Sequence, residues 1–188
     1  MSSLPRSFYA RDTVTVARGL LGKKLVRKIG GQIISGIITE TEAYRHRDDP
    51  ASHAFRRETE RNKAMFGEVG HSYVYFTYGM YFCFNVVARS PKSKAGAVLI
   101  RSLQPEKGVD LMKKNRGKTD LKNLANGPAK LSLALDITKN QYGVDLTNNS
   151  SLFITEGLQK KGKITKARRI GIKEGMEHLW NFKIIYQT

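Results

Sequence analysis

The sequence predicts an α+β fold, namely one compact domain with a largely antiparallel, curved sheet, peripheral helices and a protruding β-hairpin. Strand-like and helical patterns are interspersed without a regular βαβ rhythm. Neighbouring strand patterns are joined by short turns that contain glycine, which favours antiparallel pairs. The 188 residues suffice for one well-buried core, and no repeat or low-complexity linker divides them. We therefore expect one domain, residues 1–188, with a flexible N-terminus over residues 1–7.

A short helix and two strands come first. The segment DTVTVARGLLG (12–22) has an Asp where a helix N-cap is favoured and a Gly where a helix stops. The segment KLVRKIGGQIISGIITETEAY (24–44) indicates two strands joined at its Gly-Gly pair. A polar loop follows, and TERNKAMF (59–66) indicates one or two capped helical turns.

The second half begins with an aromatic hairpin. The segment SYVYFTYGMYFCFNVV (72–87) alternates on both sides of YGMY, which predicts a two-residue loop at Gly79-Met80. GAVLIRSLQP predicts a strand, PEKGVDLMKKNR a helix, and GPAKLSLALD a helix with Pro128 in its first turn. Loops and short strands complete the chain, which ends in HLWNFKIIYQT.

The charge is strongly positive. Thirty-three Lys and Arg stand against sixteen Asp and Glu, and the isoelectric point is near 10.1. No acidic residue occurs from residue 69 to 105, or from 158 to 173, where seven residues are basic. A basic domain of this kind is typical of a nucleic-acid binder, although a merely solvated surface is the alternative. The sequence has no apolar run of 18 residues and no basic amphipathic helix, so it does not favour a membrane partner.

Cysteine usage and the N-terminus indicate the compartment. The single cysteine, Cys83, excludes internal disulfides, zinc ribbons and cysteine-ligated iron–sulfur clusters. The first residues, MSSLPRSFYARD, lack the apolar stretch of a secretory signal. We expect an intracellular protein, in the cytoplasm or nucleoid of a bacterium or in a eukaryotic nucleus.

Seven of the seventeen aromatic residues lie in the predicted hairpin. With the loop at Gly79-Met80, Tyr78 and Tyr81 flank the tip, where their hydroxyl groups can stay solvated. Flat side chains at an exposed, acid-free tip can enter between base pairs and unstack them. An ordinary amphipathic hairpin with partly exposed tyrosines is the alternative.

Two acids could carry chemistry. On an extended strand Glu40 and Glu42 point the same way, towards the face of Ile38 and Gly36. A carboxylate held ionised beside a cleft can deprotonate a water, whereas a strand end emerging into solvent would leave both acids without a role. HRDDPASH offers two His and two Asp at a spacing that matches no tight metal template, so we expect no metal and no cofactor.

A set of motifs resembles one family. ETEAY, RN followed by MF, YVYFTYGMYFCFN, LIRSLQP, GPAKL and RIGI occur in this order between residues 8 and 182. The set resembles the 3-methyladenine (alkyladenine) DNA glycosylase family, also called methylpurine-DNA glycosylase. The resemblance implies a compact mixed α/β enzyme of base-excision repair that acts on damaged double-stranded DNA, with a monomer as the plain expectation. It would flip out alkylated or deaminated purines and hydrolyse the N-glycosidic bond, leaving an abasic site.

The resemblance also implies a role for individual residues. Glu42 matches the general base that activates water, Arg101 matches a residue that helps to hold this water, and a carbonyl near 170–172 would be its third contact. The residues implied for the base pocket are Tyr44, His53, Tyr75 and Asn85, where Asn85 screens against normal guanine. Tyr78, with Tyr81 beside it, matches the wedge that fills the emptied stack. Our candidates for contacts with the DNA backbone are Arg61, Lys130, Lys139 and Arg169, supported by the basic run 160–169.

Alternatives remain at this point. A non-enzymatic nucleic-acid binding module would need only the charge and the aromatic rings, and a bifunctional glycosylase would use a lysine to cleave the abasic strand. The loop 86–100 is longer and more basic than the resemblance leads us to expect, and Phe76 and Phe84 could alter the shape of the pocket.

Overall fold

The computed structural model describes residues 2–118, 120–157 and 162–186, and it confirms the α+β expectation. The α-helices are α1 (Arg6–Tyr9), α2 (Thr13–Leu20), α3 (Val109–Arg116) and α4 (Pro128–Ala134). The 3-10 turns are η1 (Lys63–Met65), η2 (Leu121–Asn123) and η3 (Lys139–Gln141). The strands are β1 (Lys24–Ile29), β2 (Gln32–Arg45), β3 (Ser72–Thr77), β4 (Tyr81–Val87), β5 (Gly96–Lys107), β6 (Leu152–Thr155), β7 (Gly162–Ala167) and β8 (Asn181–Tyr186).

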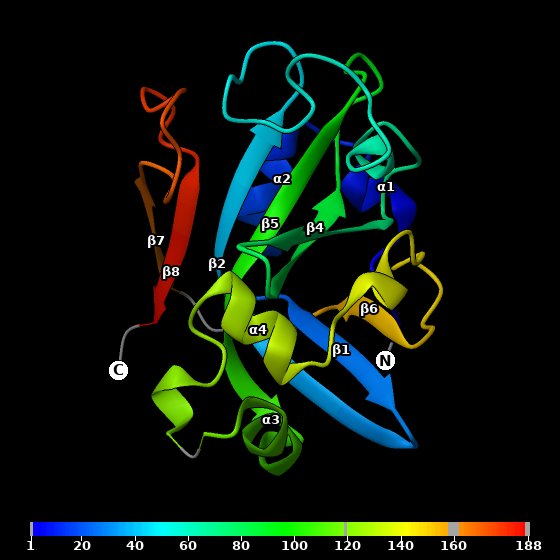
Figure 1. Ribbon diagram of the computed structural model, residues 1–188, viewed down its shortest axis with the longest axis vertical. Helices are drawn as coiled ribbons and strands as arrows, with labels where there is room; N and C mark the ends of the chain where they lie inside the picture. The colour runs from blue at the N-terminus through cyan, green and yellow to red at the C-terminus, as the bar shows by residue number, and fades with distance from the viewer. Residues whose placement is uncertain (1, 119, 158–161, 187–188) are drawn as a thin grey trace.

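The strands form one antiparallel sheet around β2, the longest strand. The order β3-β4-β5-β2-β1-β6 gives the main path, and the β7–β8 ribbon joins it at β2 (Figure 1). On one edge of β2, residues 32–37 pair with β1, whereas residues 40–42 pair with β8. The sheet therefore forks at the centre of β2, next to the two acids that the sequence singles out.

Local sequence signals explain most element ends. Asp12 caps α2 by accepting from the backbone amides of Val14 and Thr15. Gly30 and Gly31, both at positive φ, make the turn between β1 and β2 as the sequence predicts. The segment 59–66 yields only the 3-10 turn η1. Helix α3 starts later than predicted, after Gly108, because the preceding residues extend β5.

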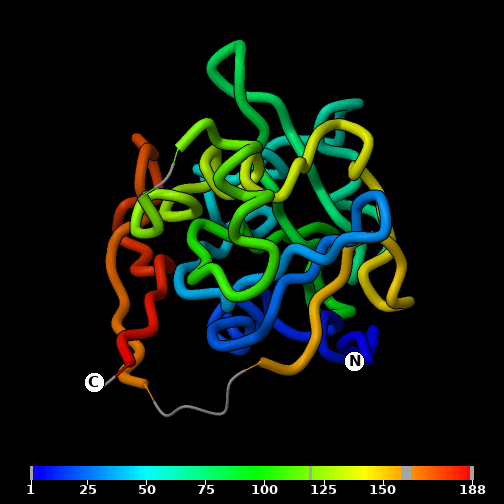
Figure 2. The backbone as a smooth tube through the Cα atoms, turned by 90° about the horizontal axis from the view of Figure 1, so that it is seen from below, coloured from blue at the N-terminus to red at the C-terminus, as the bar shows by residue number. Residues whose placement is uncertain are grey.

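The main core lies between the sheet and helices α2, α3 and α4. Helix α2 packs against β2 and β5, and α4 packs against β4 and β5. Buried Val16, Phe84, Ile100 and Leu131 belong to one apolar cluster. The β3–β4 hairpin protrudes from this body, as Figure 2 shows at the top. Its inner half is anchored in the core, and its tip is free to meet a ligand.

The hairpin turn differs from the predicted two-residue loop. Thr77 pairs with Tyr81, so the loop contains Tyr78, Gly79 and Met80. Tyr78 (φ 51°) and Gly79 (φ 68°) both adopt left-handed backbone conformations. Tyr78 therefore lies within the loop itself, and Tyr81 is the first residue of β4.

A β-bulge in β2 changes the face on which the acids lie. The pairing of β2 with β5 shifts register between Ile38 and Thr41. Ile38 packs in the main core, and after the bulge Ala43 does so too, while the Thr41 hydroxyl donates to the carbonyl oxygen of Ala17 in α2. The predicted shared face with Ile38 is therefore wrong, because the extra residue turns Glu40 and Glu42 to the opposite side of the sheet.

The N-terminal residues are packed against the body. Leu4 is buried and donates its amide to the carbonyl oxygen of Ile154, and Ser3 forms a bridge with Thr155. Arg6 pairs with Asp145 and Glu68. These contacts differ from the flexible segment that we expected over residues 1–7. Separately, no helix in the described ranges is both long enough and apolar enough to span a membrane.

Candidate active site

A cavity of about 260 Å³ lies at the root of the hairpin, on the side of the sheet away from the main core. The hairpin supplies much of its wall, and β2, β5, the loop after β2, the start of α4 and the segment after β7 supply the rest. The lining includes Tyr44, Ala51, His53, Arg61, Met65, Tyr73, Tyr75, Thr77, Tyr78, Cys83, Asn85, Leu99, Arg101, Pro128, Ile170, Gly171 and Ile172. All four residues predicted for the base pocket, Tyr44, His53, Tyr75 and Asn85, lie in this one cavity.

Aromatic rings form one wall. The His53 ring meets the Tyr75 ring edge-on, with centroids 4.7 Å apart, and its Nδ1 lies 2.8 Å from the Tyr73 hydroxyl. Burial raises the pKa of both tyrosines, so their hydroxyl groups are protonated at neutral pH. The wall is therefore uncharged, polar at its edges and shaped to receive a flat ring system.

His53 is predicted to stay neutral well into the acidic range. The residue is exposed, yet desolvation where the ring borders the cavity, followed by the positive charge of Arg61, lowers its pKa from 6.5 to about 4. The folded protein thus binds this proton at lower pH than the unfolded chain, and stability falls as the pH drops from 6.5 towards 4. An NMR titration of the imidazole protons should place the His53 midpoint near pH 4. His53→Asn should remove this part of the pH dependence of unfolding, and a His53 midpoint near 6.5 would contradict the prediction.

Glu42 lies directly behind the cavity wall and has no exposed surface. Its Oε2 accepts from the Tyr44 hydroxyl at 2.8 Å and from an Arg101 N–H at 3.2 Å. Its Oε1 accepts from the Ile170 backbone amide at 2.8 Å and from the Asn181 side-chain amide at 3.0 Å. Four donors thus hold the carboxylate rigidly, and three of their residues, Tyr44, Arg101 and Ile170, line the cavity.

Arg101 connects the two acids of β2. Its Nε donates to Glu40 Oε1 and its terminal nitrogen to Glu42 Oε2, both at 3.2 Å. Glu40 also accepts from Asn181 at 2.7 Å and lies 3.5 Å from the Lys183 ammonium. Of these three partners of Glu40 only Arg101 lines the cavity, whereas three of the four residues that donate to Glu42 do so.

The hairpin also provides the floor and the tip. Asn85 donates its side-chain amide to the Tyr73 carbonyl at 3.0 Å, and burial raises the pKa of the neighbouring Cys83 thiol. Tyr78 is 84% exposed at the tip and still borders the cavity. Tyr81 is only partly exposed and pairs with Thr77 in the ladder, so Tyr78 is the better placed of the two predicted wedge residues.

Three of the four predicted backbone contacts are accessible. Arg61 borders the cavity, Lys139 is exposed, and Lys130 is partly exposed on α4 with its ammonium 2.8 Å from Asn126 Oδ1. Arg169 is different, because its side chain has no exposed surface and pairs with Asp49 through two bonds of 2.6 and 2.7 Å. The prediction for Arg169 is therefore wrong. Of the supporting run 160–169, residues 160 and 161 lie outside the described ranges.

The buried ion pair belongs to the frame of the site. Arg169 also donates to the carbonyl oxygens of Ala43 and Gly175, and its guanidinium lies 4.7 Å from the Tyr44 ring centroid. The next residue, Ile170, donates its amide to Glu42. Asp49 and Arg169 thus fasten the loop after β2 to the segment that follows β7.

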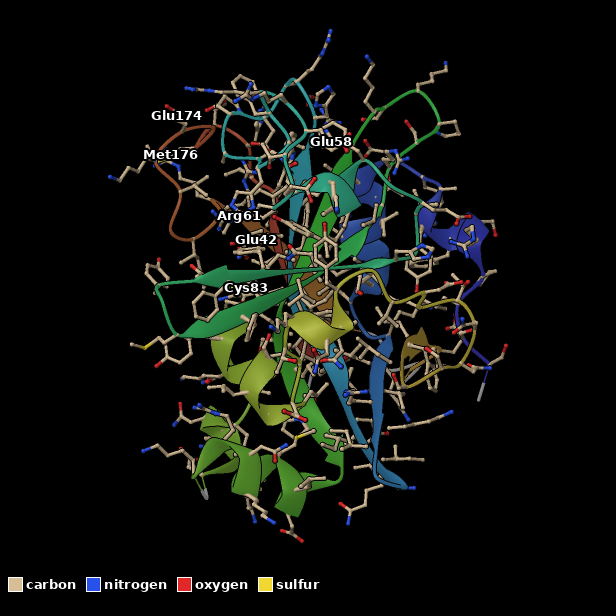
Figure 3. The ribbon with its side chains drawn as sticks, turned by 45° about the vertical axis from the view of Figure 1, so that its right-hand side comes forward. Glu42, Glu58, Arg61, Cys83, Glu174 and Met176 are labelled. Atoms are coloured by element: carbon tan, nitrogen blue, oxygen red, sulfur yellow. The ribbon has the colours of Figure 1, made fainter. Side chains whose placement is uncertain are left out.

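Sequence reasoning missed several residues of this frame. Asn181, Asp49 and the amide of Ile170 bind functional or buried groups, but they lie far from those groups along the chain. The only available signal was RIGI, where we expected a carbonyl contact to a water. Figure 3 shows Glu42, Arg61 and Cys83 near the base of the hairpin. Glu174 and Met176 lie farther out, on the segment before β8.

Comparison with known proteins identifies the family of the chain. A family model described as methylpurine-DNA glycosylase (MPG) matches residues 7–187. A Carboxydothermus hydrogenoformans protein is 49% identical over 95% of this chain and 93% of its own length. Relatives from Clostridium acetobutylicum and Agrobacterium fabrum are each 44% identical, over 96% and 95% of this chain and 93% and 87% of their own lengths. All three are provisionally named 3-methyladenine DNA glycosylases. The chain therefore belongs to the methylpurine-DNA glycosylase family.

Proposed function

We propose that the protein is a monofunctional DNA glycosylase that flips damaged purines into the cavity and hydrolyses their N-glycosidic bond. The observation that carries the proposal is the Glu42 carboxylate, fully buried and held by four donors behind an aromatic cavity on a strongly basic protein. A protein that only bound nucleic acid would have no chemical use for a carboxylate held beside its binding cavity, where burial of the charge is costly. The overall activity agrees with the family of the chain.

The base would stack on the aromatic wall. Tyr75 and His53 offer faces and edges to a flat purine, and Asn85 borders the same space. Flipping costs a few kcal/mol, and the cost is smallest for a base whose pairing is already damaged. The cavity would therefore select damaged purines partly through the weakness of their pairing.

The attacking water would be activated by Glu42. Both carboxylate oxygens are occupied in the free protein, so a water must replace one of the present donors. The Tyr44 hydroxyl is the natural donor to leave, because Tyr44 lines the cavity and would be moved by an entering base. Glu42 would then take a proton from the water, and its negative charge would stabilise the developing oxocarbenium sugar.

The DNA backbone would be held by basic residues around the opening. Lys130 and Lys139 can make sequence-independent phosphate contacts, and Arg61 can do so from the rim. Such contacts position the duplex, and the lesion is read by the cavity.

The activity can be tested with methylated duplex DNA. The purified protein should release free 3-methyladenine, and release should persist with a chelator because the proposed chemistry asks only for a carboxylate and a water. Binding without release would leave the non-enzymatic alternative. Borohydride trapping should give no covalent protein–DNA adduct, whereas an adduct would favour the lysine mechanism.

Tyr78→Ala should weaken base flipping. The tyrosine ring is the most exposed large side chain of the tip, and it would fill the space that the flipped nucleotide leaves. Loss of one base-stacking contact costs about 1–3 kcal/mol, so the flipping equilibrium should fall by about 5- to 150-fold. A fluorescent base analogue reports the flipped fraction. Met80→Ala, at the same loop, is the matched control and should have the smaller effect; unchanged flipping in Tyr78→Ala would exclude the wedge role.

A further inference from the structure

Two cations border the cavity, and only one of them is neutralised. Arg101 lies between Glu40 and Glu42 at 3.2 Å from each. Arg61 has no ion pair within residues 2–118, 120–157 and 162–186, and its one hydrogen bond is a 3.4 Å contact to the Phe76 carbonyl. Among the described residues that line the cavity there is no Asp or Glu. The rim of the cavity therefore carries an uncompensated positive charge at Arg61.

Arg61 lies over Tyr75, one of the rings on which we propose that a base stacks. Its guanidinium carbon lies over the Tyr75 ring at 5.4 Å from the centroid. Arg61 therefore already uses the cation–π attraction of this face of Tyr75. A cationic base that stacks on the same face must displace Arg61, and one that stacks elsewhere in the cavity remains beside a like charge.

The field of Arg61 reaches the interior of the cavity. Its positive charge contributes to the lowered pKa of His53, and it also acts on Tyr73 and Cys83. These three groups all line the cavity that a purine would fill. A charge on the purine would therefore interact with Arg61 in any stacked position.

We propose that Arg61 makes the cavity charge-selective, so that neutral damaged purines are favoured over cationic ones. The inference rests on the proposed glycosylase function and adds the class of lesion that the site prefers. Hypoxanthine is a neutral base, and 3-methyladenine is cationic while it is attached to deoxyribose. Like charges several ångströms apart in a partly solvated site change a rate or affinity by about tenfold.

The test compares two lesions in three forms of the protein. The ratio of kcat/KM for 3-methyladenine to kcat/KM for hypoxanthine is measured in duplexes of one sequence, for the parent, Arg61→Gln and Arg61→Lys. The ratio should rise about tenfold in Arg61→Gln, because the repulsion is lost for the cationic base alone. Arg61→Lys keeps the charge and should keep the parent ratio. Arg61 is exposed, so neither variant leaves a buried group without a partner.

A control separates this effect from phosphate binding. Lys139→Gln also removes one positive charge, but Lys139 does not line the cavity, so both kcat/KM values should fall by the same factor. If Arg61→Gln behaves like Lys139→Gln and leaves the ratio unchanged, Arg61 is a phosphate contact only and the inference is overturned. If the parent releases neither base, the proposed function itself fails, and the two failures are thereby distinguished.

Discussion

Glu42→Gln slows base release by about 10²–10⁴-fold, the usual contribution of a general base, while the variant still binds lesion-containing DNA. The amide cannot take a proton from water and carries no negative charge towards the sugar. Single-turnover release of 3-methyladenine and a gel-shift titration measure the two quantities separately. Release at the parent rate would remove Glu42 from the mechanism.

The same substitution should also reduce stability. Each carboxylate oxygen accepts two hydrogen bonds, so the amide NH₂ of Gln would face two donors in either orientation. Lost pairing of a buried polar group costs about 1–3 kcal/mol, which denaturant unfolding can measure. Glu40→Gln is the matched control, because it removes a charge from the same network at an acid of whose partners only Arg101 lines the cavity. It should slow release much less than Glu42→Gln does.

Asp49→Asn lowers the free energy of unfolding by about 3–5 kcal/mol, the loss expected when one partner of a buried ion pair is removed. Both side chains of the Asp49–Arg169 pair have no exposed surface, so the guanidinium would be left with a neutral partner in a dry site. Base release should fall as well, because Arg169 precedes the amide that holds Glu42. Urea unfolding measured beside a release assay tests both effects.

Two further variants serve as controls for the Asp49→Asn prediction. Asp12→Asn weakens a half-exposed ion pair with Arg45 and keeps an N-cap side chain, so it should cost about 1 kcal/mol or less. The double variant Asp49→Leu/Arg169→Met removes both charges and should recover much of the stability. An Asp49→Asn protein as stable as Asp12→Asn would contradict the role of the buried pair.

The sequence predicted the parts of the fold that local chemistry determines. Asp12 as a helix cap, the Gly30-Gly31 turn, Pro128 at a helix start and the alternating hairpin all depend on neighbours along the chain. The predicted hairpin loop was one residue too short. A two-residue loop is the commonest type, and no local sequence signal indicates a left-handed backbone conformation at Tyr78.

The sequence predicted the site residues that belong to a recognisable motif. It did not predict the contacts between segments that lie far apart along the chain. The four pocket residues do share one cavity, but Arg169 looked like one more surface cation in a basic run. Its partner Asp49 lies 120 residues away along the chain, so only the folded structure reveals that the pair is buried. The face of Glu42 was misjudged for a related reason, since alternation along a strand assumes that no residue is inserted.

The β-bulge near the middle of β2 determines the side of the sheet on which Glu42 lies. Ile38 and Thr41 both face the main core although they are three residues apart, so a regular strand of the same length would exchange the orientations of Thr41 and Glu42 and leave a hydroxyl where the proposed hydrolysis needs an anion. Deleting one residue between positions 38 and 41 would leave Ile38 and Thr41 two residues apart, so ordinary alternation would keep the present orientation of Glu42. A deletion at the bulge should therefore be better tolerated than one elsewhere in β2, where it would turn the residues on one side of the gap to the other face.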